Sequence, residues 1–250
     1  MIKEAIEKIL ELDGPKVVGI ADPDIPGLTR DYTERPLHQI KSPVPSPLKV
    51  STLKGFCDYL NSGTDKVYPN FIPELVLIHG HDQVSAVTSL EIKGATRSTI
   101  IIGKCMDYDF SFAKAYDLES FIVGLQSCFV KTNTRDTLLS VVSALKIEKG
   151  ATIKDDGVSQ VVQTQSGVSR VANIALPNPV TLKPFRTFLD IDQPESEFIF
   201  RINETNGGVS CRLIEADGGA WRLDAMSALR EYFEAQMALL DEEHRVSIIA

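Results

Sequence analysis

The densest cluster of metal-ligand side chains in the sequence is His79-Gly80-His81-Asp82. Histidines two residues apart on a strand lie on one face, so His79 and His81 could bind a single metal ion while Asp82 supplies an oxygen ligand. The spacing matches half of an H-x-H-x-D-H motif, but the last histidine is absent here. Glycine and aspartate are also common turn residues. Two interpretations stay open: a metal site, or an ordinary turn at the tip of a hairpin.

Two arginines are predicted to face each other across a second hairpin. Strand-like residues at 197–202 and 209–214 flank Asn206-Gly207, a favoured sequence for a two-residue hairpin turn. This turn sets Arg201 opposite Arg212, and like charges in directly opposed positions destabilise a sheet. We therefore expect an anionic group to lie over the two guanidinium groups.

That anionic group could come from the chain or from a ligand. Within the chain, the candidates are Glu204, Asp190 and Asp192. A bound anion would instead be held by two guanidinium forks, which suit carboxylate and phosphate groups. The single tryptophan could stack on such a ligand, although a lone tryptophan before a helix is also a common core anchor. The predicted anion site comprises Arg201, Arg212, Arg186, Arg222 and Trp221.

Other motifs for catalysis or cofactor binding are missing from the sequence. It contains no G-x-x-x-x-G-K-[ST], no G-x-S-x-G, and no G-x-G-x-x-G after a predicted strand. Asp155-Asp156-Gly157 and Asp190-Ile191-Asp192 could hold a divalent ion, but they do not match a calcium loop and they suit turns or edge strands. We therefore expect no cofactor, and a binding protein is favoured over a conventional enzyme.

Composition argues against two classes of partner. The chain has 26 Lys and Arg against 34 Asp and Glu, a formal net charge of −8, so general binding to a nucleic-acid backbone is not expected. Charges interrupt the N-terminal residues, and no run approaches 18 apolar residues, so neither a signal peptide nor a membrane span is expected. The four cysteines are widely spaced, as in the reduced, buried thiols of a cytoplasmic protein.

The elements that position these residues follow from hydrophobic spacing. Apolar residues that recur every three or four positions predict helices with one buried face. Ser51, Asp117, Thr134 and Asp224 are the expected N-caps of four of them. The predicted helices run through residues 3–12, 53–60, 118–130, 138–145 and 226–240.

Strand patterns complete the predicted fold. Besides the hairpin at 197–214, we expect strands at 17–20, 75–78, 84–87 and 99–102, and a hairpin that joins 161–164 to 168–171. These elements predict an α+β fold, with antiparallel sheets, packed helices and two lobes. The change from helices to strands divides the chain into an N-terminal α+β lobe, 1–146, and a β-rich lobe with the C-terminal helix, 147–250. The alternative is a single domain.

Two segments have no obvious place in a packed core. Residues 22–47 carry six prolines, which predict a long irregular arm that either forms a surface loop, wraps a neighbouring subunit or covers a site. The apolar tail 246–250 could pair with another chain. We therefore expect a homo-oligomer.

Several stretches together resemble a family of proteins of unknown activity that bacteriophages and prophages encode. The likeness spans roughly residues 48–235. It implies a phage protein that acts in the bacterial cytoplasm or in the virion, and it transfers no catalytic residue. The stretches are 116–122 (YDLESFI), 155–161 (DDGVSQV), 176–182 (LPNPVTL), 184–188 (PFRTF) and 215–221 (EADGGAW).

Three hypotheses of function follow. The first is a phage-encoded cytosolic binding or accessory protein, such as a counter-defence factor, that captures an anionic small molecule or a host protein. The second is a structural or assembly component of a phage particle, suggested by the proline-rich arm and the apolar tail. The third is a metal-dependent hydrolase that uses His79, His81 and Asp82.

Overall fold

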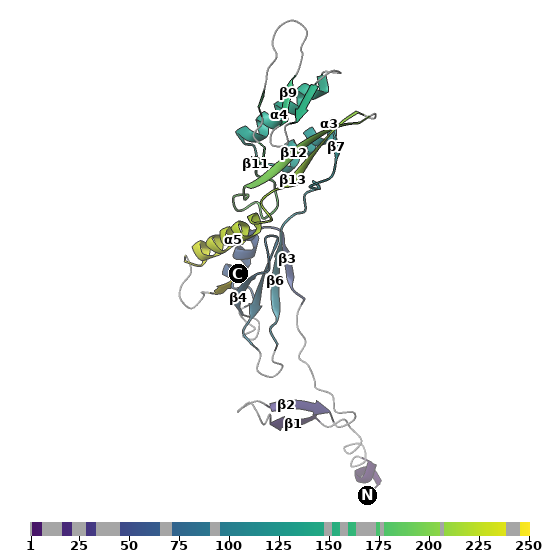
Figure 1. The fold of residues 1–250 in the computed structure, drawn as a ribbon. Helices are drawn as coiled ribbons and strands as arrows, with labels where there is room; N and C mark the ends of the chain where they lie inside the picture. Colours follow the sequence, from purple (N-terminus) through teal and green to yellow (C-terminus); the bar gives the residue numbers. More distant parts are fainter. Residues whose placement is uncertain are drawn as a thin grey trace.

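The structure is a computed structural model of the chain and has an α+β fold. Its helices and strands form two lobes that follow one another along the long axis of the molecule (Figure 1). None of the described helices is long and apolar enough to cross a membrane. The structure describes residues 2–6, 17–21, 29–33, 46–65, 72–90, 96–147, 152–155, 160–163, 174–175, 178–205, 208–238 and 246–250.

The first lobe is built on a five-stranded sheet in the order β14-β4-β5-β6-β3. Its centre is an antiparallel meander of β4, β5 and β6, which confirms the three strands predicted between residues 75 and 102. Parallel strands, β3 and β14, form the two edges. The bounds are β3 (Leu48–Val50), β4 (Pro73–Ile78), β5 (Gln83–Thr88), β6 (Thr99–Lys104) and β14 (Ser247–Ile249).

Two helices, α2 (Leu53–Ser62) and α5 (Trp221–Met237), pack in the core of the first lobe. The rings of Phe56 and Phe233 meet at 5.5 Å between centroids, so the core joins segments far apart in the chain. The N-cap of α2 is Thr52, which accepts from the backbone N–H of Gly55, so the prediction of Ser51 was wrong by one residue. The hydroxyls of Ser51 and Thr52 are both plausible caps from the sequence, and the backbone geometry selects Thr52.

The second lobe is built on an antiparallel four-stranded sheet in the order β11-β12-β13-β7. The register of its central hairpin is the predicted one: Arg201 faces Arg212, and Ile202 faces Cys211. Phe200 and Leu213 are a buried pair on the same face as Ile202 and Cys211. The bounds are β7 (Tyr116–Asp117), β11 (Val180–Leu182), β12 (Ser196–Thr205) and β13 (Gly208–Glu215).

Helices α3 (Leu118–Cys128) and α4 (Asn133–Ile147) share a buried core with this sheet. Asp117 caps α3 as predicted, because its carboxylate accepts from the N–H of Ser120. For α4 the predicted cap, Thr134, was wrong. The hydroxyl of Thr132 accepts from the N–H of Arg135, and the helix begins at residue 133.

The two cores do not divide the chain at residue 147. Helices α3 and α4, expected in the N-terminal lobe, belong to the core of the second lobe. Helix α5 and strand β14, expected in the C-terminal lobe, belong to the first. Helix α5 also begins at Trp221 rather than after Asp224, because the turn before it, with Gly218 and Gly219 at positive φ, ends earlier than the sequence suggested.

The apolar tail is used within the chain. Strand β14 pairs with β4 in parallel, with Ile248 opposite Val76. Val246 and Ile248 pack against the first core. The tail was expected to need a second chain because nothing nearby in sequence could cover it, but the edge of the first sheet does so.

Two small sheets lie outside the main cores. Strand β1 (Val17–Ala21) was predicted, but it pairs with β2 (Thr29–Thr33), inside the arm that was predicted to be irregular. Residues 29–33 contain no proline and two threonines and a tyrosine, which favour strands. In the other sheet, β9 (Gln160–Gln163) pairs with β8 (Thr152–Asp155) and with β10 (Ile174–Ala175). The predicted partner at 168–171 lies outside the described residues.

Candidate functional site

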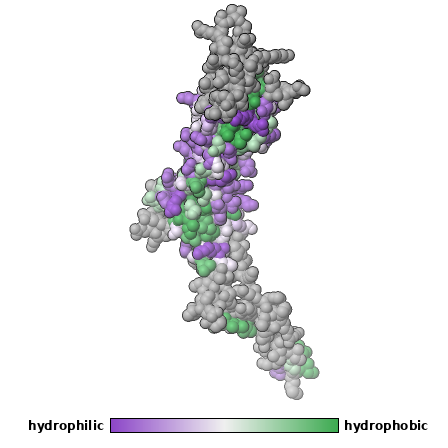
Figure 2. Space-filling model, in the orientation of Figure 1, coloured by the Kyte–Doolittle hydropathy of each residue, from purple (hydrophilic) through white to green (hydrophobic). Residues whose placement is uncertain are grey.

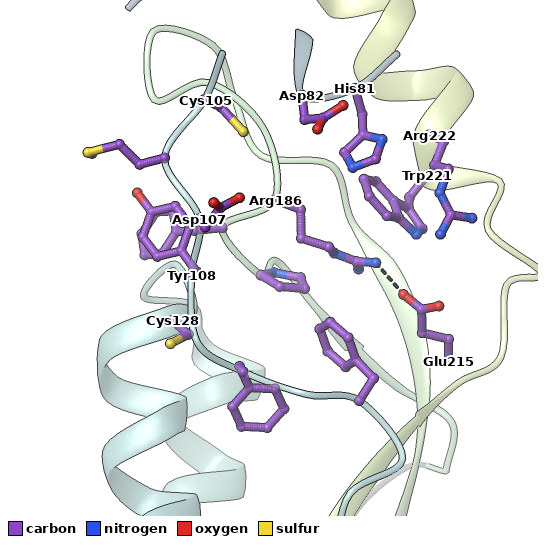
Figure 3. Close-up of a pocket in the computed structure, with 15 residues that line it drawn as sticks. His81, Asp82, Cys105, Asp107, Tyr108, Cys128, Arg186, Glu215, Trp221 and Arg222 are labelled. Carbon is purple, nitrogen blue, oxygen red and sulfur yellow. Dashed lines mark hydrogen bonds and ion pairs between the residues drawn. The ribbon is translucent and has the colours of Figure 1, made fainter. Parts of the chain in front are cut away.

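A cavity of about 290 Å³ lies where the two lobes meet, and both lobes supply its walls (Figure 3). The first lobe contributes the turn between β4 and β5 and the start of α5. The second contributes the end of β13 and the segment that leads into β7. The lining residues include His81, Asp82, Cys105, Asp107, Tyr108, Phe112, Phe185, Arg186, Glu215, Trp221 and Arg222.

The segment after β11 ties the lobes together beside the cavity. The side-chain oxygen of the buried Gln193 accepts from the N–H groups of Arg186, at 2.9 Å, and Thr187, at 3.2 Å. The hydroxyl of Thr187 donates to the carbonyl of His81 in the first lobe. Phe185 donates its N–H to Cys128 of the second lobe. These bonds fix the backbone from which Arg186 enters the site.

Arg186 is the buried charge at the centre of the junction. Its side chain is only 8% exposed, and its Nη1 donates to Glu215 Oε1 at 2.5 Å. Its Nη2 donates to Ser196 Oγ at 2.6 Å. Burial lowers the pKa of Arg186 to about 10, while the nearby carboxylate of Glu215 opposes this shift. The guanidinium therefore stays charged near neutral pH.

Helix α5 begins at the cavity without a side-chain cap. Ala220 occupies the N-cap position and cannot accept a hydrogen bond through its side chain. The first N–H groups of a helix carry partial positive charge and favour an anion nearby. Arg222, an exposed residue in the first turn, holds its guanidinium 4.9 Å from the centroid of the Trp221 ring. The partial positive charge of the helix N-terminus and the full charge of Arg222 therefore lie together at the start of α5.

His81 packs edge-on against Trp221, with 4.6 Å between the ring centroids. Burial lowers the pKa of His81, and the positive charges of Arg222 and Arg186 lower it further, whereas Asp82 raises it. The imidazole is therefore neutral at pH 7. Protonation of His81 at a lower pH would add a positive charge to those of Arg186 and Arg222 on this wall.

The remaining wall carries carboxylates, a thiol and aromatic rings. Asp82, Asp107 and Cys105 lie on the side away from Arg222 in Figure 3. Burial raises the pKa of the Cys105 thiol to about 11, and the two aspartates raise it too. A protonated thiol is a poor nucleophile. Tyr108 and Phe185 stack at 5.3 Å between centroids and form an apolar surface beside these groups.

The predicted metal ligands do not converge. The Nε2 atom of His79 forms a 2.7 Å hydrogen bond with Ser85 Oγ on β5, whereas the ring of His81 lies against Trp221. Among the described residues, no group of three or more His, Cys, Asp or Glu side chains is close enough to hold a metal ion. His81 and Asp82 do share a site, but it is the cavity between the lobes.

The five residues of the predicted anion site separate into two places. Arg186, Arg222 and Trp221 line the cavity. Arg201 and Arg212 face one another on the sheet of the second lobe and do not line it. The pleat of β13 explains the separation. Glu215 lines the cavity, and Arg212, three residues before it, points to the opposite face of the strand.

Sequence reasoning missed the other cavity residues. Tyr108 and Phe112 belong to a segment in which aromatic residues alternate with small or polar ones, and such alternation indicates partial burial rather than a binding site. Glu215 gave no sequence signal, since a carboxylate at the end of a strand is unremarkable until its partner is known. Trp221 is both a core anchor and part of the cavity wall, since it is 3% exposed and lines the cavity; its Nε1 has no hydrogen-bond partner among the described residues.

No protein-family model, no curated protein and no solved structure matches the chain.

Proposed function

We propose that this protein is a binding protein that captures an anionic small molecule in the cavity between its lobes. The observation that carries the proposal is the wall formed by Arg222 and Trp221 at the start of α5. Among the described residues, no carboxylate forms an ion pair with Arg222, whereas Arg186 is neutralised by Glu215. A guanidinium that forms no ion pair with a described residue favours a carboxylate or phosphate group. The helix adds its dipole rather than free donors, because the N–H groups of Arg222 and Leu223 donate to the carbonyls of Gly219 and Ala220.

Two further features support a ligand of this kind. Buried donors without partners, Arg186 Nε and Trp221 Nε1, belong to residues of the same wall. A buried donor that lacks an acceptor is unfavourable by about 1–3 kcal/mol, which a ligand oxygen could relieve after a small side-chain shift. The aromatic surface of Tyr108 and Phe185 suits an apolar or planar part of the ligand.

The acidic wall restricts further which ligands the cavity can accept. Asp82 and Asp107 lie across from Arg222 and would repel a uniformly anionic molecule. They would accept hydrogen bonds from hydroxyl or amino groups instead. A molecule with an anionic end, a planar or apolar middle and a donor group at its other end matches all three surfaces. Nucleotides and aromatic carboxylates with a distal hydroxyl group are two classes of this chemistry.

The single tryptophan provides a direct test. Trp221 fluorescence and the melting temperature, Tm, would be followed while AMP or 4-hydroxyphenylacetate is added, with adenosine as the probe that lacks the anion. We expect at least one anionic probe to change both signals and adenosine to change neither. Arg222→Gln should weaken binding about tenfold or more, since a hydrogen bond to a charged group contributes about 1.5–3 kcal/mol.

Arg230→Gln is the matched control. Arg230 lies on the same helix and forms an exposed pair with Glu234, away from the cavity. It should bind the probes as the unchanged protein does. The proposal is wrong if extracts of the purified protein contain no anionic metabolite and no anionic probe at millimolar concentration alters fluorescence or Tm. Equal binding by the Arg222→Gln and Arg230→Gln variants would also contradict it.

The resemblance to phage-encoded proteins supports a cellular setting for this activity. A phage protein in the cytoplasm of a bacterial host could withdraw an anionic metabolite or signal from the host, which would serve counter-defence. Mass spectrometry of small molecules released from the protein after expression in bacteria, compared with the Arg222→Gln variant, would identify the ligand.

An assembly role is the second candidate, and one observation favours it. Every residue of β1 is exposed, including Val17 at 58% and Ile20 at 49%, and Figure 2 shows apolar side chains at this end of the molecule. A two-stranded sheet is marginal on its own in water, so β1 and β2 would gain stability from a partner. Light scattering of the full chain and of a deletion of residues 1–45 tests this role. An unchanged oligomeric state would exclude a self-assembly contact there.

A further inference from the structure

The outer face of the second sheet carries a pair of opposed cations. Arg201 on β12 lies directly across from Arg212 on β13. The inner face of the same hairpin is packed against α3 and α4 through Phe200 and Leu213, so the arginines lie on the face away from that core. Directly opposed like charges destabilise a sheet unless an anion lies between them.

The rows on either side of the arginines have different chemistry. Ile199 and Ile214 form the row toward the cavity end of the hairpin, and Asn203 and Ser210 form the row toward its turn. All four are partly exposed. The face therefore presents an apolar row, a cationic row and a polar row in succession along the strands.

Among the described residues, neither Asp190 nor Asp192 forms an ion pair with Arg201 or Arg212. Asp190 accepts from the N–H groups of Leu53 and Lys54, both at 3.0 Å, and so is held at the start of α2 in the first lobe. Asp192 is exposed, and the side chain of Glu204 lies outside the described residues. Arg201 Nη1 and Arg212 Nε are buried and have no hydrogen-bond partner in the part of the chain that the structure describes.

We propose that Arg201 and Arg212 form a second anion-binding site, separate from the cavity, that takes one carboxylate or phosphate group. A single oxyanion between the guanidinium forks removes the repulsion and gives both arginines acceptors. The apolar row favours a ligand with an apolar part next to its anionic group, and the Asn203 and Ser210 row offers hydrogen bonds on the other side. Two features mark the site: the like charges directly opposed across the hairpin, and the buried guanidinium nitrogens without a partner among the described residues.

The test measures Tm of the full chain in the Arg222→Gln background, which removes the cavity's free cation. Sodium phosphate and sodium acetate are compared with sodium chloride at equal ionic strength, so that charge screening is constant. We expect phosphate, acetate or both to raise Tm by a few degrees more than chloride does, through binding to the folded state. Adding Arg201→Gln and Arg212→Gln should abolish that difference and leave the salt-free fold as stable or slightly more stable.

Lys54→Gln with Arg230→Gln is the control for net charge. It also removes two cations, each from an exposed i,i+4 pair, and should keep the anion response. An equal anion response in the Arg201 and Arg212 double change and in the control would mean general salt effects, and the proposal would be wrong. The proposal would also be wrong if the Arg201 and Arg212 double change destabilised the fold and its parent protein showed no anion response, because this result would reveal an internal carboxylate between the arginines. The anion that raises Tm more, acetate or phosphate, identifies the chemical group that the site binds. Neither result bears on whether the cavity binds its probes, so the two proposals are tested separately.

Discussion

The guanidinium carbon of Arg186 lies 4.0 Å from the centroid of the Trp221 ring. The two residues come from different lobes, since Arg186 follows β11 and Trp221 begins α5. Phe112 and Phe198 of the second lobe lie 5.1 and 5.3 Å from the same guanidinium. Arg186 is therefore a cation enclosed by aromatic rings from both lobes, and its contacts hold the cavity in shape.

Replacing Arg186 with alanine should destabilise the protein by about 2–3 kcal/mol. The change removes the cation–π contacts and leaves Glu215 without its cation, although Glu215 is 29% exposed and keeps part of its hydration. Urea denaturation measures the effect. Arg230→Ala, which breaks an exposed pair of similar length, should change stability by less than about 0.5 kcal/mol. Equal effects of the two changes would contradict the assigned role of Arg186.

Leu125→Ala should destabilise by about 2–5 kcal/mol, because Leu125 is fully buried in α3 and its truncation leaves a cavity in the second core. Gln126→Ala, one residue further on the exposed face of the same helix, should change stability by less than about 0.5 kcal/mol. Denaturant melts of the two variants check the helical phase. Similar losses in both would show that the buried face was assigned wrongly.

Trp221 fluorescence should report the protonation of His81. The folded-state pKa of His81 is lowered, so the imidazole charges in the folded protein at a pH below its usual value near 6.5. A positive imidazolium 4.6 Å from the indole ring should quench its emission. A pH titration should show a quenching step with a midpoint below 6.5 that is absent in His81→Asn. A step that persists in this variant would assign it to another group.

The same shift predicts how stability depends on pH. Between the folded and the unfolded pKa of His81, the unfolded chain binds more protons, so stability falls as the pH is lowered from about 6.5 toward the folded value. Above pH 7 His81 contributes no slope, because it is neutral in both states. The difference in unfolding free energy between pH 7.5 and pH 5.5 should be smaller in His81→Asn than in the unchanged protein.

Deleting residues 246–250 should lower stability without changing the mass in solution. Strand β14 contributes backbone hydrogen bonds to β4, and Val246 and Ile248 cover the first core. Light scattering and thermal melts of the full and shortened chains separate the two effects. A lower mass with an unchanged Tm would show that the tail forms an intermolecular contact.

The features that the sequence alone determined are those set by neighbouring residues. The buried face of α3, its Asp117 cap and the strands of the β4-β5-β6 meander follow from local periodicity and side-chain chemistry. The register that opposes Arg201 and Arg212 also follows, because a two-residue turn leaves a hairpin no other pairing. Each of these depends on residues within one helix or one run of consecutive strands.

The tertiary structure decided which elements share a core and which side chains share a site. Thr187 reaches the carbonyl of His81 across 106 residues, and Asp190 reaches the N–H of Leu53 across 137. Ile248 of the tail pairs with Val76 at the sheet edge, and the two are 172 residues apart in sequence (248 − 76). Long-range packing of this kind depends on the combined burial of whole faces, and no local pattern encodes it. For that reason the sequence grouped five candidate anion-binding residues into one site, whereas the pleat of β13 and the return of α5 to the first lobe place them in two.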